Sequence, residues 1–109
     1  MRAAKHWADL VVIDGPGAPQ GDTFSLRQRR HKVGSAPGVE VRLADAGVSK
    51  EHALLWLKEG VFYLQDEAST NGTFLNGKQI TQEELCDGDE IRVGGTRLVF
   101  RIVPLPPDS

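Results

Sequence analysis

The chain has 109 residues, which is the usual size of one domain and too short for two. Hydrophobic residues make up 39% and charged residues 26%, a composition that excludes disorder along the whole chain. The formal charge of −2 excludes a global positive field that would draw the protein to nucleic acid or to an anionic membrane.

Short apolar stretches separated by turn residues recur along the chain, which is typical of an all-β domain. Leu10–Ile13 predicts a first strand, and the Gly- and Pro-rich segment Asp14–Asp22 predicts a surface loop after it. In TFSLRQRR (23–30) and in VEVRL (39–43), apolar residues alternate with polar ones. This alternation predicts two half-buried strands.

The segment Ser49–Gly60 gives conflicting signals. Its Ala, Leu, Glu and Lys residues favour a helix, with Ser49 as a possible N-cap and Gly60 just past the end. Five consecutive apolar residues, Ala53–Leu57, give no stripe with a period of 3.6, and the strand-like VFYLQD (61–66) follows directly. Local reasoning leaves helix and strand open for this segment.

Two hairpins are predicted in the second half of the chain. Asn76-Gly77, between FL and KQI, supplies the positive φ angles of a tight turn. Gly94-Gly95 joins EIRV to TRLVFRIV in the same way. PLPPDS (104–109) then predicts a Pro-rich tail or linker.

The ordered set of motifs along the chain resembles the forkhead-associated (FHA) domain. The family pattern is Gly-Arg, then Ser-x-x-His, then Asn-Gly-Thr, and finally Leu-x-x-Gly-Asp. The matching segments are Gly34, Val39–Leu43, Val48–Ala53, Leu64–Asp66, Ser69–Thr73, Asn76-Gly77 and Leu85–Gly94. The resemblance implies an antiparallel two-sheet β-sandwich of ten or eleven strands over residues 7–103, after an N-terminal extension at 1–6. It also favours a strand over His52–Lys58.

By the same resemblance, the loops at one end of the sandwich bind phosphothreonine peptides. The family's phosphate contacts match Ser49 and Thr70, and the residue matching Asn71 binds the peptide backbone. Lys50 adds positive charge next to Ser49. A phosphothreonine carries about −1.5 to −2 charges and three acceptor oxygens, so hydroxyl groups, N–H donors and a cation suit it.

Four further residues are expected to support these loops. The resemblance implies that His52 bonds the loops from behind without touching the ligand. Gly72 allows a tight turn after Asn71. Gly34 and Thr73 complete the supporting set.

One position departs from the family pattern, because Ser35 stands where the family has the Arg that helps hold the phosphate. A charge-assisted hydrogen bond contributes about 1.5–3 kcal/mol, so its loss weakens binding roughly tenfold to a hundredfold. Arg42 or Lys50 is the expected substitute cation. The alternative is a degenerate domain that binds a partner independently of phosphorylation, or that self-associates.

Other chemistries fit the sequence less well. Ser49, His52 and Asp66 supply the residue types of a hydrolase triad, but no nucleophile elbow or oxyanion hole accompanies them. We therefore expect no catalytic residue. The Gly-rich loop 14–22 lacks the Gly-Lys-Ser/Thr of a nucleotide site, so no cofactor is expected.

Metal and nucleic-acid sites are also not expected. His6, His31, His52 and Cys86 lack zinc-ligand spacing, with His6 and His31 predicted to be solvated and Cys86 packed. The basic run Arg27–Lys32 has no interleaved aromatic residue, so a solvated strand is favoured.

The expected partner is therefore a protein in which a Ser/Thr kinase has phosphorylated a threonine. The single cysteine cannot form an intramolecular disulfide, and the N-terminus lacks the pattern of a signal peptide. No apolar run approaches the roughly 20 residues that a membrane span requires. We predict a cytoplasmic location and no membrane insertion.

Overall fold

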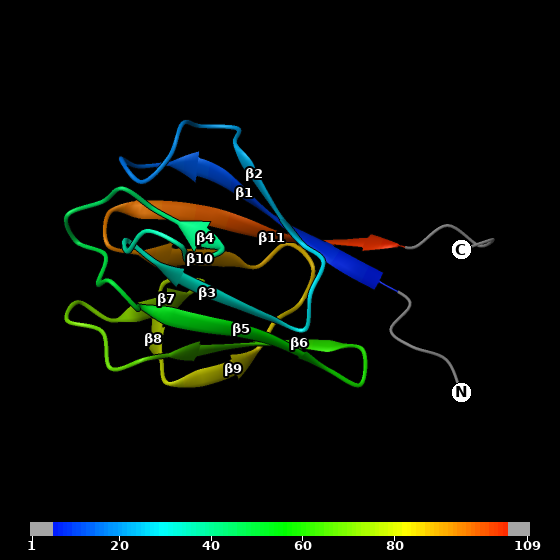
Figure 1. Cartoon of the computed structure of the whole chain (residues 1–109). Coiled ribbons are helices and arrows are strands. Elements are labelled where there is room, and N and C mark those ends of the chain that lie inside the picture. The colour runs from blue at the N-terminus through cyan, green and yellow to red at the C-terminus, as the bar shows by residue number, and fades with distance from the viewer. Residues whose placement is uncertain (1–5, 105–109) are drawn as a thin grey trace.

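Two β-sheets packed face to face form the structure (Figure 1). The computed structural model describes residues 6–104, and within them the chain has eleven strands and no helix. The strands are β1 (His6–Asp14), β2 (Thr23–Leu26), β3 (Arg30–Gly34), β4 (Val41–Arg42), β5 (Ala53–Lys58), β6 (Val61–Asp66), β7 (Thr73–Leu75), β8 (Lys78–Ile80), β9 (Gln82–Glu84), β10 (Glu90–Val93) and β11 (Thr96–Pro104). The predicted all-β sandwich is confirmed.

The larger sheet has six strands in the order β2-β1-β11-β10-β7-β8, and the smaller has five in the order β4-β3-β5-β6-β9. The pair β3 and β4 is parallel, whereas the neighbouring pairs of the same sheet are antiparallel. The predicted two-sheet antiparallel sandwich is thus present, with one parallel pair at the edge of the smaller sheet. Residues 35–40 carry the chain back before β4, so β4 runs beside β3 in the same direction.

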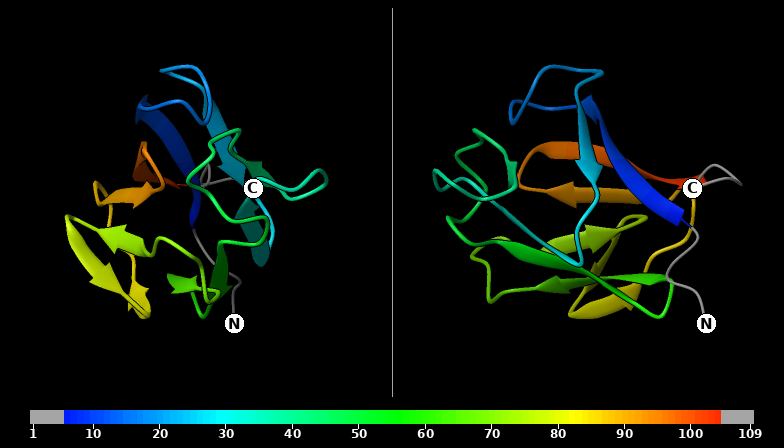
Figure 2. Two further views of the ribbon diagram at one scale, coloured as in Figure 1. Left: turned by 90° about the vertical axis from the view of Figure 1, so that its left-hand side faces the viewer. Right: turned by 45° about the vertical axis from the view of Figure 1, so that its right-hand side comes forward.

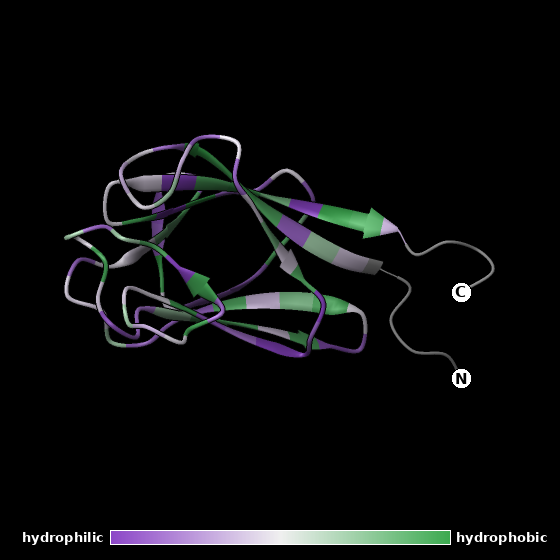
Figure 3. Cartoon of the chain, turned by 45° about the horizontal axis from the view of Figure 1, so that its top comes forward, coloured by the Kyte–Doolittle hydropathy of each residue, from purple (hydrophilic) through white to green (hydrophobic). Residues whose placement is uncertain are grey.

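The core lies between the two sheets and consists of alternate residues from their strands. The long strands show alternating green and paler or purple bands in Figure 3, as expected when every second side chain faces inward. The largest fully buried side chains include Phe100, Leu10 and Leu98 from the larger sheet and Leu55 and Leu64 from the smaller one. Phe62 and Phe100 meet across the core in an edge-to-face contact, with ring centroids 5.5 Å apart.

Residues 23–30, predicted as one strand, belong to two. β2 ends at Leu26 in the larger sheet, and β3 begins at Arg30 in the smaller sheet. Arg27 lies at the crossing, where its guanidinium donates to the Ala8 carbonyl at 2.7 Å and pairs with Asp9 at 3.1 Å. These contacts hold the chain to β1 just before it leaves that sheet.

The strand predicted over 39–43 is only two residues long in the structure, Val41–Arg42. The Glu40 carboxylate accepts the N–H of Lys32 at 2.8 Å. A side chain therefore occupies the edge of β3 where a longer strand would have placed its backbone, and the parallel ladder ends there.

The ambiguous segment Ser49–Gly60 contains β5, so the strand prediction is confirmed. Ala53, Leu55 and Leu57 are buried, whereas Leu54 and Trp56 are half-buried on the other face. A strand separates the five apolar residues between two faces, and pairing with both β3 and β6 satisfies its backbone. Tertiary pairing thus overrides the helix propensity of this segment.

Both predicted hairpins are present. Asn76 and Gly77 have φ angles of 51° and 85° and connect β7 to β8. Gly94, with φ of 59°, begins the turn between β10 and β11. The predicted extension 1–6 and tail 104–109 lie outside the described residues, except that β1 begins at His6 and β11 ends at Pro104. Within residues 6–104, no helix is long and apolar enough to cross a membrane.

Candidate functional site

The loops that carry the predicted binding residues gather at one end of the sandwich. These are the connections β3–β4, β4–β5, β6–β7 and β10–β11, at the left-hand end of Figure 1, and they face the viewer in the left panel of Figure 2. β1 begins and β11 ends at the opposite end. The rigid sheets thus present four loops on one surface.

Backbone contacts join the β3–β4 loop to the β4–β5 loop. The Ser35 N–H donates to the Ser49 carbonyl at 3.0 Å, and the Ala36 N–H donates to the Lys50 carbonyl at 3.3 Å. A Cβ atom at Gly34 would lie 2.0 Å from the Lys50 carbonyl oxygen. Only glycine permits this approach, which explains why the supporting set includes Gly34.

His52 ties the β4–β5 loop to the β6–β7 loop. Its side chain is fully buried, Nδ1 accepts the Ser49 N–H at 3.0 Å, and Nε2 lies 2.8 Å from the Gly72 carbonyl oxygen. Because Nδ1 accepts a hydrogen bond, the proton resides on Nε2, which donates to Gly72. His52 therefore supports both loops from below.

Ser49 and Asn71 make two further connections across the same loops. The Ser49 Oγ accepts the Thr70 N–H at 3.1 Å. Asn71 donates from its side-chain amide to the Gly47 carbonyl at 2.9 Å. Gly72 follows with φ of 89°, as the predicted tight turn requires. Ser49, Thr70 and Asn71 are thus brought together, with the Thr70 and Asn71 side chains exposed.

Arg42 lies beside this group. In the parallel pair of β3 and β4, Arg42 is opposite Gly34, and its Nε donates to the Ser35 carbonyl at 3.1 Å. The guanidinium has four other N–H donors on its Nη atoms, and within residues 6–104 none of them has a hydrogen-bond partner. A cation is therefore attached to Ser35, the residue predicted to stand in place of the family's Arg.

Two carboxylates hold the loops in place, the buried Asp45 and the half-buried Asp66. Neither supporting role was predicted from the sequence. Asp66 accepts hydrogen bonds from the Ser69 hydroxyl and N–H and from the Thr73 hydroxyl, the last at 2.7 Å. Asp45 accepts from the N–H groups of Gly47 and Gly95 and from the Thr96 hydroxyl. Each carboxylate therefore fixes a loop by several donors.

Burial raises the pKa of both carboxyl groups, but the hydrogen bonds outweigh it. The Thr96 hydroxyl and the N–H groups of Gly47 and Gly95 hold the pKa of Asp45 below its usual 3.8. The Ser69 and Thr73 hydroxyls do the same for the pKa of Asp66. Both groups are thus stabilised as carboxylates in the folded protein.

The protein is expected to lose thermal stability as the pH falls below about 4, because protonation removes the preference of the folded state for these two carboxylates. Their contribution is complete above the unfolded pKa and disappears as the pH falls through the lower folded pKa. Thermal unfolding at pH values from about 7 to 3 measures this decline. Asp45→Asn/Asp66→Asn should flatten the decline, and the exposed control Asp22→Asn should not; equal profiles would refute the assignment.

The triad reading of Ser49, His52 and Asp66 does not match the hydrogen bonds. The Ser49 Oγ accepts from Thr70, and the hydrogen bonds of the His52 ring within residues 6–104 go to the Ser49 backbone N–H and the Gly72 carbonyl. The Asp66 carboxylate is bonded to Ser69 and Thr73. No hydrogen bond links the hydroxyl to the imidazole or the imidazole to the carboxylate.

Two smaller predictions were wrong. His31 is 3% exposed, because it faces the core from β3, and burial lowers its pKa. Cys86 is exposed, because it follows β9 in a turn whose backbone bonds to Asp89. Within residues 6–104, no three His, Cys, Asp or Glu side chains are grouped to hold a metal ion. The burial of His6 lies outside what the structure describes.

Comparison with protein families gives a match to the FHA domain over residues 31–94. The glycogen accumulation regulator GarA of Mycolicibacterium smegmatis is 39% identical over 100 residues, covering 92% of this chain and 62% of that protein. The oxoglutarate dehydrogenase inhibitor of Corynebacterium efficiens is 40% identical over 95 residues, covering 87% of this chain and 66% of that protein. The chain therefore spans less than two thirds of the length of these relatives.

Solved structures of FHA domains share the fold. One comes from a structural and functional analysis of phosphothreonine-dependent FHA domain interactions, with a TM-score of 0.82, 34% identity, and coverage of 91% of this chain and 99% of that one. The FHA domain of FhaA, complexed with the intracellular domain of Rv3910, has a TM-score of 0.78 and 34% identity, covering 86% and 99% of the two chains. Similarity in fold thus comes with substantial sequence identity.

Proposed function

Because the chain belongs to the FHA domain family, we propose that its loop end binds phosphothreonine segments of a partner protein and catalyses no reaction. The observation that carries the proposal is the group of Ser35, Ser49 and Thr70, linked by hydrogen bonds at the loop end. One similar domain comes from an analysis of phosphothreonine-dependent FHA domain interactions, and another was solved in complex with a protein partner. The bound segment would connect the domain to a kinase-controlled partner.

The phosphate is expected to lie over Ser49 and Thr70. The Ser49 hydroxyl accepts the Thr70 N–H, so its own proton can be donated to a phosphate oxygen. Lys50 follows Ser49 in the chain, and its exposed side chain adds a charge to the same loop. Asn71 donates to Gly47 through its amide nitrogen, which leaves its carbonyl oxygen available to accept an N–H of the peptide backbone.

Arg42 is the substitute cation in this proposal. The Nε–H to Ser35 bond fixes one edge of the guanidinium against the β3–β4 loop and leaves the Nη donors available. The Ser35 N–H also donates to the Ser49 carbonyl. Ser35 therefore connects Arg42 to Ser49, whose hydroxyl is proposed to bind the phosphate. A guanidinium presents paired donors to phosphate oxygens, which suits this role better than an ammonium.

Arg42→Ala should weaken phosphothreonine-peptide binding about tenfold or more, because one charge-assisted contact is lost. Isothermal titration calorimetry measures the change, with Arg101→Ala as a control that removes an equal charge from an exposed position on β11. Ser35→Arg, which restores the family residue, should recover the affinity of Arg42→Ala. If Arg42→Ala and Arg101→Ala bind alike, whereas Lys50→Ala loses affinity, Lys50 is the substitute and Arg42 is not.

The proposed function itself is tested by titrating a degenerate phosphothreonine peptide pool and its unphosphorylated counterpart. Only the phosphorylated pool should bind. Equal binding of both pools, or binding of neither, would contradict the proposal and favour recognition that is independent of phosphorylation. Self-association would appear instead as a dependence of the sedimentation coefficient on protein concentration.

We propose that this recognition takes place in the cytoplasm, where Ser/Thr kinases use ATP to phosphorylate threonine residues. The one cysteine of the sequence, Cys86, is exposed and forms no disulfide within the chain. Such cysteine usage fits a reducing compartment. Fluorescence microscopy of the tagged full-length protein, compared with a secreted control, tests the location.

A further inference from the structure

The outward face of the smaller sheet carries an apolar strip that contains none of the predicted binding residues. Leu54, Trp56 and Tyr63 are half-buried there, because they alternate with the core residues of β5 and β6. Trp56 and Tyr63 are directly opposite in the register, and their rings stack with centroids 5.4 Å apart and an interplanar angle of 19°. The stacked rings form the centre of this apolar strip.

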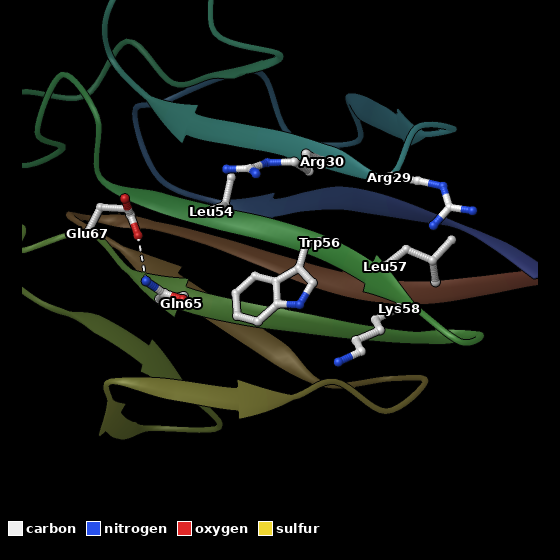
Figure 4. Close-up of a pocket in the computed structure, with 8 residues that line it drawn as sticks. All are labelled: Arg29, Arg30, Leu54, Trp56, Leu57, Lys58, Gln65 and Glu67. Carbon is white, nitrogen blue, oxygen red and sulfur yellow. Dashed lines mark hydrogen bonds between the residues drawn. The ribbon is translucent and has the colours of Figure 1, made fainter.

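A hollow of about 570 Å³ lies over this strip. Figure 4 shows Trp56 at its centre, with Arg29 and Arg30 along the β3 side and Lys58 beyond the indole. A volume of this size accommodates a few side chains of a bound segment. The hollow is open to solvent. The end of the hollow that contains Glu67 lies close to the binding loops, because the Glu67 N–H bonds to the His52 carbonyl.

Three cationic side chains line the hollow, Arg29, Arg30 and Lys58. Within residues 6–104, Arg29, Arg30 and Lys58 form no ion pair, whereas Arg27 and Arg97 both do. The carboxylate in the hollow, Glu67, is at the far end and accepts a hydrogen bond from Gln65, and the exposed Glu84 lies on the β9 side, opposite Tyr63. The charge distribution therefore favours an acidic occupant near β3 and Lys58.

We propose that this hollow is a second interaction surface, which binds an acidic protein segment carrying an aromatic or aliphatic side chain. The apolar side chain lies against Trp56 and Leu54, and flanking carboxylates pair with Arg29, Arg30 and Lys58. Burial of the apolar side chain provides affinity, and the charges select and orient the segment. Nucleic acid is the less favoured occupant, because its evenly charged backbone would meet the Glu67 carboxylate along the hollow, whereas a protein segment can place its carboxylates near β3 and Lys58 alone.

The test uses the full chain, labelled with nitrogen-15, and a short capped peptide in which Phe-Leu is flanked on each side by Asp and Glu. The peptide should shift the Trp56 indole N–H signal and the amides of Leu54 and Lys58. Trp56→Phe identifies the indole signal, since the sequence has two tryptophans. Peptides with Lys and Arg in place of the acids, or Ala-Ala in place of Phe-Leu, should produce no comparable shifts.

Arg29→Glu/Arg30→Glu should lower the affinity for the acidic peptide about tenfold or more. The affinity should also fall as the salt concentration rises from about 0.05 to 0.5 M. The control Lys78→Glu/Arg101→Glu makes an equal change of charge at exposed sites on the larger sheet and should have little effect. Equal losses in both variants, charge-independent peptide binding, or stronger shifts from a short oligothymidylate would overturn the proposal. The acidic peptide contains no phosphothreonine, so its binding to the hollow can succeed or fail independently of phosphopeptide binding at the loops.

Discussion

Ser49→Ala is expected to reduce phosphothreonine-peptide affinity roughly a hundredfold. The substitution removes the hydroxyl that would donate to the phosphate. It also removes the acceptor of the Thr70 N–H, which now bonds to the Ser49 Oγ at 3.1 Å. Both consequences affect the place where the phosphate is proposed to bind, so Ser49→Ala should lower the affinity more than the loss of any exposed cation does.

Isothermal titration calorimetry with one selected phosphothreonine peptide measures this loss. Ser25→Ala removes an equivalent hydroxyl from an exposed position on β2 and should bind like the native protein. Urea unfolding of Ser49→Ala should show an intact fold, since Ser49 lies in a loop. If the folded Ser49→Ala protein binds as tightly as Ser25→Ala does, Ser49 does not contact the phosphate.

His52→Leu is expected to lower the free energy of unfolding by about 3 kcal/mol. Leucine fills much of the buried space, but the Ser49 N–H and the Gly72 carbonyl then lose their partners. Each unsatisfied buried group costs about 1–3 kcal/mol. The two loops would separate from their common support, so peptide binding should also weaken.

His31→Leu is a closely matched comparison, because His31 is also a buried histidine and lies in β3, next to β5, the strand that follows His52. Within residues 6–104 the His31 ring forms no hydrogen bond, and its Nδ1 is buried without a partner. Its replacement by leucine should therefore cost little or even stabilise the protein. Urea unfolding at neutral pH measures both variants, and equal losses would show that the hydrogen bonds of His52 are not what matters.

The sequence predicted the sandwich well because its hairpin turns and alternating strands are local signals. Asn76-Gly77 requires positive φ angles that few other residue pairs adopt, so its hairpin is readable from two residues. Ser49–Gly60 could not be decided locally, because its propensities favour a helix. Pairing of β5 with both β3 and β6, which involves residues distant in sequence, determines the strand.

The loop residues were predictable only as an ordered set of motifs. The supporting role of Asp45 was missed, since one Asp in a loop gives no signal, and its partners Gly95 and Thr96 are about fifty residues away. The sequence predicted an exposed His31 and a packed Cys86, and both predictions were wrong, because the face that one residue occupies depends on strand register and turn geometry that no local signal gives.

The surface around Trp56 was also beyond sequence reasoning. The basic run Arg27–Lys32 contains no aromatic residue. In the fold, however, Arg30 is paired across strands with Trp56, which in turn is paired with Tyr63. The combination of charge and aromatic rings exists only after three strands have come together.

The most direct test of phosphothreonine recognition is a nitrogen-15 NMR titration of the full chain with one peptide in its phosphorylated and unphosphorylated forms. The amide signals of Ser49, Lys50, Thr70 and Asn71 should shift with the phosphorylated peptide alone. Identical spectra with the two forms, or phosphate-dependent shifts located away from these four residues, would contradict it.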